Sequence, residues 1–135
     1  MIPHRSNMDW ILNDLADSVP YVRHIIVLSA DGLRIAQYGA DPDTADRLAA
    51  ACAGLQSLAA AVGHEFPHGD GSMRLVVIEV DGGYFYLMAA GDRAYLAVLA
   101  DEGVDAGLVS HQMRDLVARI GEHLSTPPRN PEVVA

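Results

Sequence analysis

The chain has 135 residues, with 18 acidic side chains against 9 basic ones, which gives a net charge of −9 at neutral pH. All of the basic residues are arginines, so the chain lacks the lysine that a phosphate-binding P-loop or a Schiff-base enzyme requires. The negative charge also argues against direct binding to nucleic acid or to an anionic membrane. Any nucleotide that matters here is therefore expected to bind to a partner.

This length suits one domain with a single hydrophobic core. The first residues lack an apolar segment of secretory type, and no stretch approaches the roughly 18 apolar residues of a membrane-spanning helix. We therefore expect a cytoplasmic protein without direct membrane insertion. This expectation is compatible with recruitment of the protein to a membrane-associated complex by its partners.

The first predicted element is an amphipathic helix that begins near Ser6 or Asn7, either of which can cap it, and ends near Ser18, before Pro20. Residues 1–6 are expected to be flexible. The apolar side of this helix comprises Met8, Ile11, Leu12, Leu15 and Val19.

Two strands, at residues 23–30 and 33–39, follow on either side of Asp31 and Gly32. An Asp-Gly pair between two β-rich segments favours a hairpin with a type I′ turn, in which both central residues have positive φ. The two strands are thus predicted to be neighbours in the sheet.

The central predicted helix runs from Asp43 to Val62, after Asp41 and Pro42. A rotation of about 100° per residue gives a core-facing stripe of Leu48, Cys52, Leu55, Ala59 and Val62, with Ala51 and Leu58 beside it. The opposite face holds one charged residue among six, namely Asp46, Ala50, Ala53, Gly54, Ser57 and Ala61. A solvated face normally carries more charge, so we expect this one to contact another chain. The alternative is that alanine simply favours helix and that a third layer of the same domain covers this face.

Three more strands are predicted at residues 73–80, 84–90 and 94–100, joined by short glycine-containing turns that force an antiparallel meander. Because these strands are apolar on both faces, the sheet must be covered on both sides. The last helix, residues 104–124, has an apolar side of Leu108, Val109, Leu116, Val117, Ile120 and Leu124. The chain is thus predicted to form a three-layer α/β/α sandwich with a five-stranded antiparallel sheet, in the order α-β-β-α-β-β-β-α. The proline-rich tail, residues 125–135, is expected to be disordered.

Two features could carry chemistry. His64, Glu65 and His68 match the H-E-x-x-H pattern of zinc proteases, but Pro67 is expected to end the helix that would place both histidines on one face. Cys52 lies on the core stripe, which favours a buried hydrophobic role over that of a nucleophile. We therefore expect no catalytic residue, no cofactor and no metal site.

Four segments resemble the Roadblock/LC7 domain: WILNDL (10–15), VPYVRHIIVLSADGL (19–33), ADRLAAACAGLQSLA (45–59) and YLAVLAD (95–101). The likeness covers about residues 7–124, which we take as the domain, and is greater still to the Roadblock/LC7 proteins of actinobacterial conservon operons. It implies a profilin-like sandwich that forms a homodimer, in which the central helices pack together and the third strands pair edge to edge.

The resemblance further implies a regulator of a small Ras-like GTPase, encoded beside a sensor histidine kinase and acting in a signalling complex. Some relatives are GTPase-activating proteins that reposition the GTPase's own residues, whereas others only bind or scaffold. The protein is therefore expected to be a non-enzymatic adaptor. Whether an arginine acts in trans is left open among Arg23, Arg34, Arg47, Arg74 and Arg93.

Two alternatives remain. One is a small-molecule sensor domain, for which the strands offer few polar groups, chiefly Glu79, Tyr84 and Tyr86. The other is a passive scaffold whose partner is not a GTPase.

Overall fold

The computed structural model describes residues 3–91 and 93–125, with side chains for residues 8–91 and 93–122. The elements follow the predicted order, with the bounds α1 (Pro3–Ser18), β1 (Val22–Ser29), β2 (Arg34–Tyr38), α2 (Pro42–Gly63), β3 (Leu75–Val80), β4 (Gly83–Ala89), β5 (Ala94–Asp101) and α3 (Ala106–Ser125). The prediction placed the start of α1 too late, because the helix begins at Pro3 rather than at a Ser6 or Asn7 cap. Proline is favoured in the first turn, where its missing N–H costs nothing. Residues 1–2 and the predicted disordered tail from residue 126 onward lie outside the described residues.

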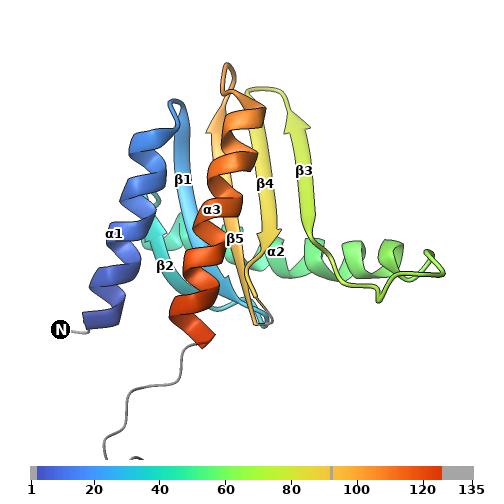
Figure 1. The fold of residues 1–135 in the computed structure, drawn as a ribbon. Helices are drawn as coiled ribbons and strands as arrows, with labels where there is room; N and C mark the ends of the chain where they lie inside the picture. Colours follow the sequence, from blue (N-terminus) through green and yellow to red (C-terminus); the bar gives the residue numbers. More distant parts are fainter. Residues whose placement is uncertain (1–2, 92, 126–135) are drawn as a thin grey trace, which may run out of the picture.

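The five strands form one antiparallel sheet in the order β2-β1-β5-β4-β3 (Figure 1). The predicted β1–β2 hairpin and the β3-β4-β5 meander are both confirmed. The two units join through β1 and β5, where Ile25 lies opposite Val98 at the centre of the sheet. As a result, β2 and β3 form the two edges.

Helices α1 and α3 cover one face of the sheet and α2 crosses the other, which confirms the three-layer sandwich (Figure 1). The predicted apolar side of α1 is buried throughout, from Met8 to Val19. Helix α3 contributes Val109, Leu116 and Ile120 as predicted, and also Met113, which the sequence analysis did not include. The side chain of Leu124 lies outside the described residues.

The β1–β2 turn differs from the prediction. Gly32 has a φ of +86°, but Asp31 does not have positive φ, so the turn is not of type I′. Instead the Ser29 N–H bonds to the Leu33 carbonyl at 2.8 Å and the Gly32 N–H bonds to the Ser29 carbonyl at 2.9 Å, which closes a three-residue loop. Such loops place a left-handed glycine last, and here that position falls on Gly32. The hairpin is therefore confirmed and its turn type corrected.

Candidate interaction surface

Helix α2 is positioned by its N-terminal half. The Asp41 carboxylate accepts a hydrogen bond from the Thr44 N–H at 2.7 Å, and Pro42 opens the first turn. The hydrogen bonds from Thr44 hold the pKa of Asp41 below its usual range, so the cap is ionised at neutral pH. From this cap the helix runs across the strands, and its C-terminal turns extend past β3 at the edge of the sheet (Figure 1).

The core-facing side of α2 differs in part from the predicted stripe. Cys52 is buried as predicted, but the other two fully buried positions are Ala45 and Ala49. Leu58 and Val62, expected on or beside the core stripe, are 67% and 62% exposed. The buried side is rotated by roughly 60° from the predicted one, because small residues let the first turns lie close to the sheet. This rotation places Leu58 on the side away from the sheet and Val62 on the flank of the helix, so both side chains remain exposed.

The six residues predicted to form the contact face lie on the side of α2 away from the sheet, but not all of them are free. Ala50, Gly54, Ser57 and Ala61 are exposed. A Cβ added at Gly54 would meet nothing within 4 Å, so there is open space above this position. These four residues form what we call the outer face of α2.

The remaining two of the six have partners within the domain. Asp46 pairs with Arg34 of β2, with 3.2 Å between the Asp46 Oδ1 and Arg34 Nε atoms. Ala53 is half-buried, and its Cβ would lie 3.3 Å from a Cβ added at Gly32, in the tip of the β1–β2 hairpin. A larger side chain at position 53 would thus collide with the hairpin tip of the same chain.

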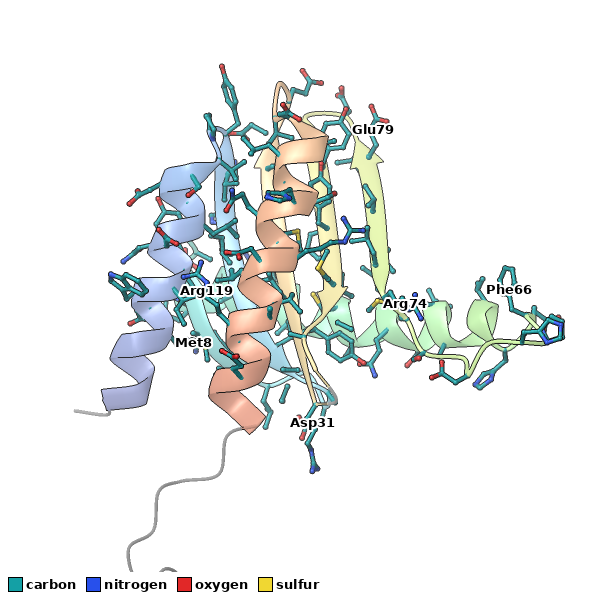
Figure 2. The ribbon with its side chains drawn as sticks, in the orientation of Figure 1. Met8, Asp31, Phe66, Arg74, Glu79 and Arg119 are labelled. Atoms are coloured by element: carbon teal, nitrogen blue, oxygen red, sulfur yellow. The ribbon has the colours of Figure 1, made fainter. Side chains whose placement is uncertain are left out.

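An apolar stripe that the sequence analysis missed lies beside the outer face. Leu58, Val62 and Phe66 are each more than 60% exposed. Leu58 and Val62 are one helical turn apart, and Phe66 follows in the turn after the helix, at the far end of α2 from its cap (Figure 2). The i, i+4, i+8 spacing was visible in the sequence, but it reads equally well as a core stripe. We call these three residues the α2 apolar stripe.

The two edges of the sheet are protected to different degrees. On β2, Arg34 bonds to Asp46 and Gln37, the Gln37 amide bonds to the Ala40 carbonyl, and every side chain is at least half-buried. On β3, by contrast, Val77 is 50% exposed toward the α1 and α3 side and Val80 is 56% exposed toward the α2 side. Exposed apolar edge strands tend to pair with another strand. Strand β3 is therefore the edge that is open to association.

The chain is similar to a known protein family and to solved structures. The family model described as "Roadblock/LC7 domain" matches residues 8–100. The chain belongs to the Roadblock/LC7 family. Among solved structures, a Roadblock/LC7 domain from Streptomyces avermitilis is 39% identical, with a TM-score of 0.81, and the match covers 87% of this chain and 98% of that one.

Less similar structures share the Roadblock/LC7 fold. The gliding protein MglB from Thermus thermophilus is 19% identical with a TM-score of 0.79, and the match covers 88% of this chain and 89% of that one. An MglB described as having a tetrameric arrangement is 18% identical with a TM-score of 0.80, and the match covers 88% of each chain. At these identities the likeness concerns the fold. No curated protein sequence matches this chain significantly.

In this Roadblock/LC7 protein, the two features that could carry chemistry have structural explanations. Burial raises the pKa of the Cys52 thiol to about 11, so the thiol is protonated at neutral pH and a poor nucleophile. Helix α2 ends at Gly63, so His64 is its C-terminal cap and His68 lies in the following turn. The histidines are therefore not one helical turn apart. Among the described residues no group of His, Cys, Asp or Glu side chains is placed to hold a metal ion.

Of the polar residues on the strands, Tyr84 and Tyr86 pack against the core, whereas Glu79 is exposed. Tyr86 is 1% exposed and packs in the core beneath α3, while the Tyr84 hydroxyl lies 3.5 Å from Glu79. The loop between α2 and β3 borders a depression of about 400 Å³, to which His68, Asp70 and Arg74 contribute exposed side chains. This hollow is open to solvent, unlike the enclosed apolar pockets that bind small molecules.

The candidate arginines divide into two groups. Arg23 pairs with Asp101 at 2.8 Å, Arg34 pairs with Asp46, and Arg47 donates to the Thr44 hydroxyl at 3.1 Å. Arg74 and Arg93 are exposed, directly before β3 and in the β4–β5 turn. The geometry does not single out one of them. None of the helices among the described residues has the length and apolar character needed to cross a membrane.

Proposed function

We propose that this Roadblock/LC7 protein is a non-enzymatic, homodimeric regulator that binds a small Ras-like GTPase and modulates its nucleotide state in a signalling complex. The observation that carries the proposal is the outer face of α2 together with the α2 apolar stripe. These adjoining surfaces are exposed, uncharged and partly apolar on a chain that otherwise carries a net charge of −9. Surfaces of this composition usually serve as contact sites.

Three features favour self-association through α2 and the β3 edge of the sheet. Strand β3 has an open edge with exposed valines on both faces, so two copies of β3 can pair into one continuous sheet. The α2 apolar stripe lies on turns that extend past β3, so in such a dimer it would lie close to the partner chain (Figure 1). The exposed Gly54 leaves room for a second helix to approach closely. A two-fold arrangement would use the same patch on both copies.

The proposed partner follows from what the chain lacks and from its family. A protein without lysine cannot form the usual phosphate-binding loop, so nucleotide recognition belongs to the partner. We propose that the dimer acts as an accessory protein, by selecting or reshaping one nucleotide state of the GTPase. From the resemblance to conservon proteins, we further propose that the dimer works with a sensor histidine kinase complex. Its partners would recruit it to a membrane-associated complex.

The experiment is a pull-down from native lysate with the tagged protein, run in parallel after loading with a GTP analogue and with GDP, and analysed by mass spectrometry. The proposal predicts enrichment of a Ras-like GTPase in one of the two nucleotide states. Recovery of other proteins without a GTPase in either state would contradict it and favour a passive scaffold. A thermal-shift screen with metabolites tests the sensor alternative, since a ligand of the folded state raises the melting temperature.

A further inference from the structure

We draw no further inference here: the strongest candidate, the strip of sheet surface over β3 and the start of β4 that neither α1 nor α3 covers, where Val77 is half exposed beside Tyr84 and Glu79, carries none because nothing in the structure shows what covers it.

Discussion

Gly32 in the β1–β2 turn lies against Ala53 of α2, so that a Cβ added at Gly32 would come within 3.3 Å of the Ala53 Cβ and 3.7 Å of the Ala49 carbonyl oxygen. The hairpin tip and the middle of α2 are therefore held together by two small residues. Gly32 also has a φ of +86°, which glycine adopts at no steric cost. Packing within the domain therefore explains why Ala53 is small. It does not explain Gly54, where an added Cβ would meet nothing within 4 Å.

The first prediction concerns this contact. Ala53→Leu should lower the free energy of unfolding by about 1–3 kcal/mol, because the larger side chain must displace the hairpin tip. Ala50→Leu is the matched control, since Ala50 is exposed on the same helix and the change should stay within about 0.5 kcal/mol. Urea denaturation at low protein concentration measures both. Equal losses for the two variants would show that the hairpin tip does not restrict Ala53.

The second prediction concerns Tyr21, which has a φ of +76° and a side chain that is 60% exposed. A bulky residue in the left-handed region is strained by about 1–2 kcal/mol. Tyr21→Gly should therefore raise the free energy of unfolding by about 1 kcal/mol over Tyr21→Ala, which keeps the strain and removes only the ring. Thermal unfolding should show this as a melting temperature about 3 °C higher. A melting temperature for Tyr21→Gly at or below that of Tyr21→Ala would contradict the account.

The third prediction concerns alkaline pH. Burial raises the pKa of Cys52 to about 11, above its value in the unfolded chain, so the folded state holds this proton more tightly. Ionisation of Cys52 therefore leaves the free energy of unfolding unchanged below about pH 9. As the pH rises toward 11, the free energy of unfolding falls by about 3 kcal/mol at most, because the unfolded chain loses this proton first.

The Cys52→Ala variant tests this. It should be less stable than the original protein at pH 7, because the substitution leaves a small cavity. Its stability should nevertheless fall less steeply between pH 9 and 11 in urea titrations. Parallel pH profiles for the two proteins would argue against a buried thiol.

The fourth prediction concerns the α2 apolar stripe. Leu58→Asp should leave the stability of the isolated domain within about 0.5 kcal/mol of the original, since the side chain is 67% exposed. The same change should weaken self-association about tenfold or more, measured by analytical ultracentrifugation over a concentration series. Leu12→Asp, at a fully buried position of α1, should instead unfold the protein. An unchanged dissociation constant for Leu58→Asp would remove the stripe from the proposed interface.

Most of the fold could be predicted because its signals are local. Asp41 and Pro42 mark the start of α2, the glycine-containing turns mark the hairpins, and the spacing from Met8 to Val19 gives the buried side of α1. The pairing of β1 with β5 carries no such signal, since it joins residues far apart in the chain, such as Ile25 and Val98. Nor does the turn sequence distinguish a two-residue from a three-residue loop.

The candidate surface was predicted less completely, for a physical reason. Periodicity assigns the larger residues to the core, but the start of α2 lies so close to the sheet that Ala45 and Ala49 are buried there. The resulting rotation of the helix places Leu58 on the side away from the sheet and Val62 on its flank, and so the exposure of both residues was not predicted. Gly54 could be placed correctly because it lies opposite the sheet under either assignment.

The central claim is that the outer face of α2 is a contact between chains, and light scattering of three proteins tests it most directly. The unmodified protein should have a molar mass of about twice the 14.4 kDa of one chain. Gly54→Glu should shift the mass toward one chain, because a charge and added bulk enter the open space that a second helix would fill. Ala118→Glu, on the exposed side of α3, should keep the dimer mass. A Gly54→Glu protein that keeps the dimer mass, or an unmodified protein that is monomeric at every concentration, would contradict the claim.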